Sequence, residues 1–251
     1  MIQKGRILAV DDEDGITEYL QDLFETAGYD VQTASGGWQA WEQICSETFD
    51  FVMTDVRMER GDGIELVEKV RDMPNPKPVI AIMSAFTDVL ISDVYERGAV
   101  AFISKPAKSN LLVNTVKKAL TSDAEKWLDL SDRPNAAFIE LSFDSAVDAV
   151  RLGLIGFGKG GLFLNLTSGF PFEEQPIRFK LDFNTGSVKS FQGQGIVKWV
   201  RRTSSRYFYQ GAGIEFIGLN QESKAYVLNH NMANMPTSYI PVGVIPPEAK
   251  K

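Results

Sequence analysis

Five polar residues stand at or just beyond the ends of short apolar runs in the first half of this 251-residue chain: Asp11, Asp12, Asp55, Ser84 and Lys105. Aspartate carboxylates are hard oxygen ligands that suit Mg²⁺, which takes a few carboxylates together with waters and phosphate oxygens. A carboxylate can also attack a phosphoryl donor, while a metal ion and an ammonium group neutralise the oxygens being transferred. The residue types therefore indicate phosphoryl transfer to an aspartate.

The apolar runs before these residues have the length of buried strands and alternate with helical patterns. The predicted strands are Ile7–Val10, Val31–Ala34, Phe49–Thr54, Val79–Met83 and Val100–Ile103. Five strand–helix repeats predict a parallel sheet with helices on both faces. Asp55 alone could merely cap its strand. Because the carboxyl ends of parallel strands share one edge, we instead expect the five polar residues to meet there.

These residues resemble the receiver domain of two-component response regulators. The resemblance covers residues 5–120 and rests on Asp11-Asp12, Asp55, Asp62-Gly63, Ser84-Ala85 and Lys105-Pro106. It implies a doubly wound, five-stranded, flavodoxin-like α/β fold that is phosphorylated by a histidine kinase. It implies a signalling protein rather than an enzyme, apart from its own phosphorylation and dephosphorylation.

The same resemblance implies roles for individual residues. Asp55 is the implied phosphoacceptor, and Asp12, Asp55 and the backbone carbonyl of Arg57 are the implied Mg²⁺ ligands, with Asp11 in the same acidic pocket. Ser84 and Lys105 are expected to sense the phosphoryl group. Phe102 stands where the family has its aromatic switch, and Lys105–Pro106 is expected to be a cis peptide bond. Glu59 and Gly61 depart from the family pattern, which commonly has Pro and an apolar residue in this loop.

After Pro134 the spacing of apolar residues changes from a helical pattern to one typical of strands. Six strand candidates follow at intervals of roughly 10–15 residues, which predicts a small all-β barrel. They are Ala137–Phe143, Leu152–Phe157, Gly161–Leu166, Pro176–Phe183, Phe191–Val200 and Tyr207–Phe216. Asn220 is expected to cap a final helix. The predicted organisation is a domain at 1–121, a helical linker at 122–134, the barrel with its helix at 135–235 and a flexible tail at 236–251.

The linker leaves two alternatives open. A helical stripe continues from Leu112 through Trp127 to Leu128, but Ser122–Glu125 has the form of a capping box, which would begin a new helix. The predicted linker is therefore one long helix or two. An exposed stripe could pair with a second copy as a coiled coil and form a homodimer. The other alternative is that the stripe packs against the chain's own domains.

The second half resembles a PilZ domain, a small β-barrel known for binding cyclic di-GMP. The resemblance covers residues 135–220 and rests on Gly160–Leu164, Gly195–Val200 and Gly211–Leu219. Members that bind the dinucleotide carry an RxxxR arm and a D/N-x-S-x-x-G turn, which supply arginine forks and small polar groups.

Most of these binding positions are altered here. Arg133 is the only arginine before the first strand, and Gly156 and Gly158 replace the turn's polar residues, so that only Gly161 survives. We therefore expect no cyclic di-GMP binding at the usual site and a barrel that binds an output protein. The alternative is a cyclic di-GMP effector gated by the receiver. A basic patch at 201–206 could serve a partner or be a solvated hairpin tip.

Composition limits the other classes of function. The net charge of −7 argues against a nonspecific DNA binder or an anionic-membrane binder, and no apolar run is long enough to enter a membrane. A single cysteine, Cys45, and a single histidine, His230, cannot build a Cys/His zinc site. We expect His230 on the surface. Only four apolar residues precede Asp11, too few for a signal peptide, so a cytoplasmic location is expected.

Overall fold

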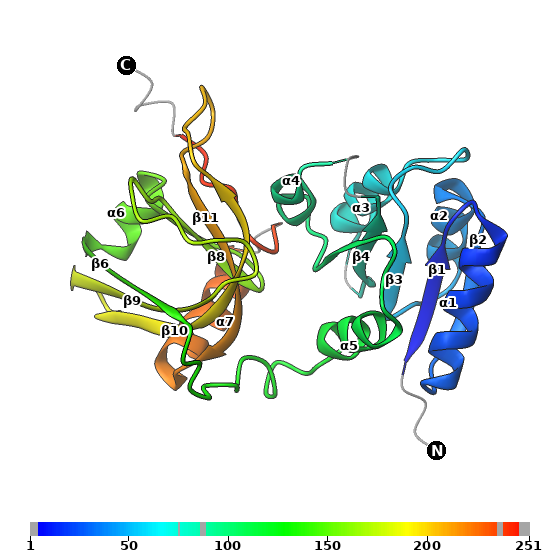
Figure 1. Ribbon diagram of the computed structural model, residues 1–251, viewed down its shortest axis with the longest axis horizontal. Helices are drawn as coiled ribbons and strands as arrows, with labels where there is room; N and C mark the ends of the chain where they lie inside the picture. Colours follow the sequence, from blue (N-terminus) through cyan, green and yellow to red (C-terminus); the bar gives the residue numbers. More distant parts are fainter. Residues whose placement is uncertain (1–4, 75, 86–88, 235–237, 246–251) are drawn as a thin grey trace. The chain divides into compact units, whose positions relative to one another are not determined.

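The computed structural model describes residues 5–74, 76–85, 89–234 and 238–245. The chain divides into two compact units, Met1–Thr121 and Ser122–Lys251. Figure 1 shows an α/β unit at the N-terminal side and a sheet-rich unit at the C-terminal side. In the described residues no helix has both the length and the apolar character needed to cross a membrane.

The first unit is built on a five-stranded parallel sheet, which confirms the predicted α/β fold. The strand order is β2-β1-β3-β4-β5. The strands are β1 (Arg6–Val10), β2 (Asp30–Ala34), β3 (Phe51–Thr54), β4 (Val79–Ser84) and β5 (Phe102–Ser104). The helices between and after them are α1 (Asp14–Thr26), α2 (Gly37–Ser46), α3 (Gly63–Asp72), α4 (Ile91–Glu96) and α5 (Ser109–Ala119).

Helices cover both faces of this sheet (Figure 1). Leu20 and Phe24 of α1 and Val116 of α5 pack in one apolar cluster with strand side chains such as Ile7. The apolar sides of α2, α3 and α4 pack in a second cluster on the opposite face. Burial on both faces explains why the strands are near-continuous apolar runs. It also holds the strand ends in fixed positions.

The second unit is a curled sheet of six strands. Its elements are β6 (Ala137–Ser145), α6 (Ala146–Arg151), β7 (Ile155–Phe157), β8 (Gly161–Leu164), β9 (Pro176–Thr185), β10 (Ser190–Arg201), β11 (Gly211–Leu219) and α7 (Gln221–Asn234). The strand order is β6-β9-β10-β11-β8-β7. β6 runs parallel to β9, and the other neighbours are antiparallel. Asn220 begins α7 as predicted, since its side chain accepts a hydrogen bond from the Ser223 amide.

The predicted small all-β barrel is observed in part: the six strands form a curled half-barrel, which in the described residues ends on two unjoined edges, β6 and β7. The short helix α6 stands between these two strands in the sequence and was not predicted. Ser145 caps it by accepting from the amide of Asp148. Ala149 of α6 lies in the core of the unit, so the helix contributes apolar packing where the chain passes from one edge strand to the other.

The predicted helical linker at 122–134 is also wrong. A single helical turn forms at its start, where the Ser122 hydroxyl donates to the Glu125 carboxylate and the Lys126 amide donates to the Ser122 carbonyl. Trp127 then takes a φ of 55°, which no helix continues. Its ring is buried edge-on against Phe216, 5.6 Å between centroids. The segment thus packs against its own unit, the alternative to a coiled coil.

The predicted flexible tail is wrong for residues 238–245, whereas 236–237 and 246–251 lie outside the described residues. Ile240 and Val242 are buried. The carbonyls of Ser238 and Tyr239 accept hydrogen bonds from the amides of Lys159 and Gly160. The segment crosses the turn between β7 and β8, and its apolar side chains supply core that the open sheet leaves incomplete.

The expectation of a surface position for His230 needs correction. The ring lies half-buried beside Tyr226 and Phe157, with centroids 6.0 Å and 5.8 Å away. This burial lowers the pKa of the His230 imidazole. The polar residues near His230 in the sequence of the final helix gave no indication of its contacts with aromatic rings.

Candidate functional site

The sheet register brings the predicted residues together at the carboxyl ends of the parallel strands. Val10 of β1 pairs with Thr54 of β3, so Asp11 and Asp55 leave neighbouring strands at the same level. The Asp55 amide donates to the Val10 carbonyl at 3.0 Å. On the other side, Ser84 ends β4, and its carbonyl accepts from the amide of Lys105 at 2.9 Å. The predicted meeting of strand ends is therefore observed.

Lys105 joins the two buried acids. Its Nζ lies 2.7 Å from Asp11 Oδ2 and 2.7 Å from Asp55 Oδ2. The Lys105–Pro106 bond is cis, as expected. The Asp11 side chain is fully buried and that of Asp55 is 12% exposed. Charge-assisted bonds of this length are strong, so the ammonium holds both carboxylates in one geometry.

Burial shifts the ionisation of this cluster. Loss of solvation raises the pKa of Asp11, although its bonds to Lys105 and to the Glu13 amide act in the opposite direction. Burial works against the charge on Lys105, but hydrogen bonds to Asp11 and Asp55 outweigh it, and the pKa of Lys105 is raised. Lys105 therefore stays an ammonium at neutral pH, and burial disfavours the charged form of Asp11.

The backbone around Asp55 is tightly constrained. Its Oδ1 accepts from the amide of Val56 at 2.6 Å, while its carbonyl accepts from the Thr54 hydroxyl at 2.9 Å. A Cβ on Gly63 would fall 1.8 Å from that carbonyl oxygen, so only glycine allows α3 to begin there. Asp62 caps α3 by accepting from the Ile64 amide at 2.6 Å. Thr54 was not predicted to be part of the site, whereas the Asp62-Gly63 pair was recognised in the sequence.

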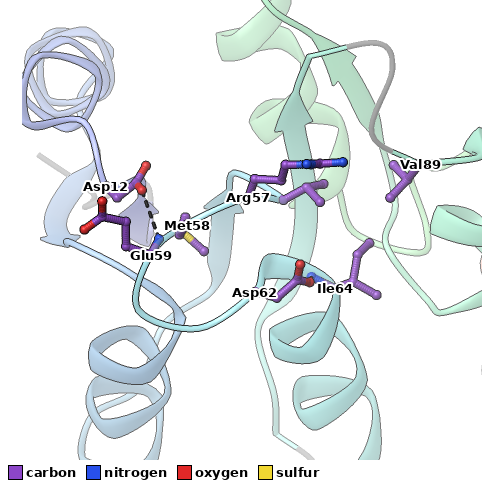
Figure 2. A pocket seen from close by; sticks show the side chains of 8 residues that line it. Asp12, Arg57, Met58, Glu59, Asp62, Ile64 and Val89 are labelled. Atoms are coloured by element: carbon purple, nitrogen blue, oxygen red, sulfur yellow. Dashed lines mark hydrogen bonds between the residues drawn. The ribbon is translucent and has the colours of Figure 1, made fainter.

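An open depression of about 660 Å³ lies beside this cluster. It is lined by Asp12, Val56, Arg57, Met58, Glu59, Asp62, Ile64 and Val89. Figure 2 shows Asp12 and Glu59 side by side at one end, where Asp12 Oδ2 accepts from the Glu59 amide at 3.0 Å. Glu59, a departure from the expected loop pattern, thus contributes its backbone to the site. The depression gives a ligand access to the sheet edge.

The donor set suits a divalent cation. Asp11, Asp12 and Asp55 supply three carboxylates against the one ammonium of Lys105, which leaves a formal charge of −2 among these four side chains. Within the described ranges no three His, Cys, Asp or Glu side chains form a ready-made metal cluster. Mg²⁺ needs no such cage, because it keeps waters and takes one or two carboxylates. The oxygen donors here fit that preference.

The remaining predicted residues lie around this centre. Ser84 is buried at the end of β4. Phe102 is half-buried on β5 and packs against the cluster under α2, α3 and α4. Arg57 lines the depression, and in Figure 2 its side chain extends toward Val89, away from Asp12. The side chains of Asp11, Asp55 and Lys105 are in direct contact through the two ion pairs of Lys105.

The positions singled out in the second unit do not form an open site. Arg133 makes an ion pair with Asp129. A Cβ on Gly158 would fall 2.5 Å from the Tyr239 carbonyl oxygen, and one on Gly161 would fall 2.7 Å from Ile240 Cγ1. A Cβ on Gly156 would come within 3.0 Å of Pro241. The glycine turn is therefore covered by the segment 238–241.

Comparisons with known proteins agree with this geometry in the first unit. Residues 7–117 match the response regulator receiver domain. The chain is 35% identical over 133 residues to the transcriptional regulatory protein ZraR of Salmonella typhimurium, covering 53% of this chain and 30% of that protein. It is 31% identical over 164 residues to the transcriptional regulatory protein CpxR homolog of Haemophilus influenzae, covering 65% of this chain and 68% of that protein.

This chain belongs to the response regulator family. Among solved structures, its receiver unit is similar to the chemotaxis response regulator CheY4 of Vibrio cholerae, with 28% identity, a TM-score of 0.43, and coverage of 46% of this chain and 98% of that one. The Thermotoga maritima response regulator TrrA, in complex with Mg²⁺ and BeF, has 29% identity, the same TM-score and the same coverage. The chain spans only 30% of the length of the ZraR protein.

Proposed function

We propose that this response regulator takes a phosphoryl group from a histidine kinase onto Asp55 and passes the signal to a protein partner through its second unit. The observation that carries the proposal is the Asp11–Lys105–Asp55 cluster, with both Lys105 contacts at 2.7 Å. It combines a nucleophilic carboxylate, a fixed ammonium and a neighbouring acid. An open depression beside it admits the donor.

In the proposed reaction an Asp55 carboxylate oxygen bonds to phosphorus as the phosphorus–nitrogen bond of a phosphohistidine breaks. The electron pair of that bond returns to the donor's imidazole. Bound Mg²⁺, held by Asp12, Asp55 and the Arg57 carbonyl, would supply charge neutralisation for the phosphoryl oxygens. Asp55 reacts as a carboxylate that is already oriented by the Val56 amide.

After the transfer, Lys105 would pair with the phosphoryl group in place of the Asp55 carboxylate. Because Asp11 also holds its ammonium, Lys105 keeps its position when Asp55 becomes an acyl phosphate. Its N–H groups can then donate to a phosphoryl oxygen, and the Ser84 hydroxyl at the neighbouring strand end can do the same. Phe102, half-buried on β5, would report this change by repacking.

We further propose that the second unit is a PilZ-like output module that does not take cyclic di-GMP at the usual turn. Support comes from the six-stranded curled sheet with its terminal helix. The missing polar residues and the cover over Gly158 and Gly161 argue against the ligand. Arg133 is already engaged by Asp129, so moving it to a phosphate would leave that carboxylate without its partner.

Phosphorylation with acetyl phosphate tests the receiver proposal and its metal requirement. The full chain should gain one phosphoryl group only when Mg²⁺ is present. Asp12→Asn should raise the Mg²⁺ concentration needed for half-maximal phosphorylation, because it removes a charged ligand. Asp14→Asn, in the same acidic run but at the start of α1, is the matched control and should not. Equal Mg²⁺ dependence in all three proteins would contradict the assigned role of Asp12.

Titration calorimetry of the full chain with cyclic di-GMP tests the output proposal. We expect no saturable heat at micromolar ligand. Saturable micromolar binding would overturn the proposal and favour a ligand-gated effector. A variant with Arg133→Ala would then tell whether the usual arm is responsible.

A further inference from the structure

The strand β6 forms an unusually open edge of the second sheet. It has nine residues and stands at the end of the strand order, paired in parallel with β9. Apart from the ladder with β9, no backbone hydrogen bond joins residues 137–144 to another strand in the part of the chain that the structure describes. One side of the strand therefore presents its amides and carbonyls without a strand partner. The opposite edge, β7, has only three residues.

β6 lacks the residues that most often protect a sheet edge, and its two charged residues are Glu140 and Asp144. Proteins usually blunt exposed edges with lysine, proline, bulges or short strands. Residues 137–143 contain no lysine or proline and pair with 177–183 in one unbroken register. The strand is thus long and regular, which is the form that accepts another strand.

The inner row of β6 also lacks cover. Ala137, Ile139, Leu141 and Phe143 pack against the core yet stay only partly buried. Their neighbours on β9 are closed off, with Ile177 and Leu181 at 0% exposure and Phe183 at 4%. A further strand beside β6 would bury the remaining apolar surface of this row.

We propose that the occupant is β6 of a second copy of this chain, added antiparallel about a two-fold axis at Leu141. This axis pairs all nine residues. On the inner face Ile139 lies opposite Phe143 of the second copy, and on the outer face Glu140 lies opposite Ser142. Moving the axis by one residue would place Glu140 opposite either Glu140 or Asp144 of the second copy. Carboxylates directly opposite one another are unfavourable, so charge selects the Leu141 register.

The remaining charges are compatible with this pairing. Lys180 of β9 contacts Glu140 at 2.9 Å and Asp182 at 2.7 Å, so the Glu140 carboxylate already has a cation. Ser142 is exposed on the outer face of the strand. The proposal concerns the second unit only and does not depend on phosphorylation of the first.

Sedimentation velocity of the full chain over a concentration series tests the proposal. The wild type should show a reversible monomer–dimer equilibrium. Ser142→Lys should tighten it, because the new ammonium lies opposite Glu140 of the second copy, and Ser142→Glu should weaken it. Two identical cross-strand pairs change together, so each dissociation constant should shift by about 2- to 30-fold, in opposite directions.

Ser187→Lys and Ser187→Glu make the same charge changes at an exposed turn between β9 and β10 and serve as controls. They should leave the dissociation constant near that of the wild type. A wild type that stays monomeric would overturn the proposal. So would a dimer that ignores both Ser142 variants, since another surface would then form it.

Discussion

At the residue scale, the site depends on one lysine that satisfies two carboxylates. Lys105 contacts Asp11 and Asp55 at equal distances, yet the two acids differ in burial. Asp11 is enclosed and its pKa is raised, whereas Asp55 is oriented by the Val56 amide and its side chain keeps some exposure to solvent. The same cation therefore holds both carboxylates in place, the enclosed one of Asp11 and the partly exposed one of Asp55.

Asp11→Asn should increase the free energy of unfolding at neutral pH. The pKa of Asp11 in the folded protein lies above its ordinary value of 3.8, so the folded state binds the proton more tightly than the unfolded state. Ionising Asp11 thus lowers the free energy of unfolding. This loss is complete at pH values above the raised pKa, and it is absent at pH values below the ordinary pKa. The gain in the variant should shrink as the pH falls through this window.

Urea denaturation of wild type and Asp11→Asn across that pH range measures this difference. Asp144→Asn, an exposed acid of the second unit, provides the control. A variant that is less stable than the wild type at neutral pH would contradict the account, because the ion pair with Lys105 would then outweigh the burial of Asp11.

At the element scale, the start of α3 at Gly63 and the C-terminal segment 238–245 determine how the site and the core of the second unit are built. Gly63 lets α3 start against the Asp55 carbonyl, and the segment 238–245 completes the core beside β7 and β8. Both features depend on close backbone approach. Substitutions at these points should therefore act on stability as well as on the site.

Gly63→Ala should destabilise the receiver unit by about 1–3 kcal/mol or more, since the added Cβ would lie 1.8 Å from the Asp55 carbonyl oxygen. Gly15→Ala in α1 is the matched control, because a Cβ there meets nothing within 4 Å. That variant should gain about 0.4–1 kcal/mol by restricting the unfolded chain. Chemical denaturation compares the two, and equal effects would contradict the packing described around Asp55.

Ile240→Ala should destabilise the second unit by about 2–5 kcal/mol, because the side chain is fully buried. Met232→Ala removes a side chain that is 80% exposed and should change stability by less than about 0.5 kcal/mol. Thermal unfolding of both variants measures this. If Ile240→Ala behaves like Met232→Ala, residues 238–245 are a loose tail after all.

The receiver fold could be predicted from the sequence because each strand is a buried apolar run and each end carries a polar residue. The cluster at Asp11, Asp55 and Lys105 followed from parallel topology. The linker could not, because its apolar spacing suits a helix while the burial of Trp127 favours a turn. Residues 238–245 were missed because four prolines in the last sixteen residues concealed a short segment that is held by tertiary contacts.

At the scale of the whole molecule, the chain joins a receiver with an open acidic site to a sheet whose glycine turn is covered by its own C-terminal segment. The first unit has the chemistry for receiving a signal. The second offers an unprotected strand edge in place of an open ligand turn. Input is therefore expected to be covalent, and output is expected to pass through protein contacts.

The central claim is that Asp55 accepts the phosphoryl group. Intact-mass measurement of the full chain after incubation with acetyl phosphate and Mg²⁺ tests it most directly, with Asp55→Asn and the control Asp144→Asn treated in parallel. The wild type and Asp144→Asn should each gain the mass of one phosphoryl group, and Asp55→Asn should gain none. A gain in Asp55→Asn equal to that of the wild type would contradict the account.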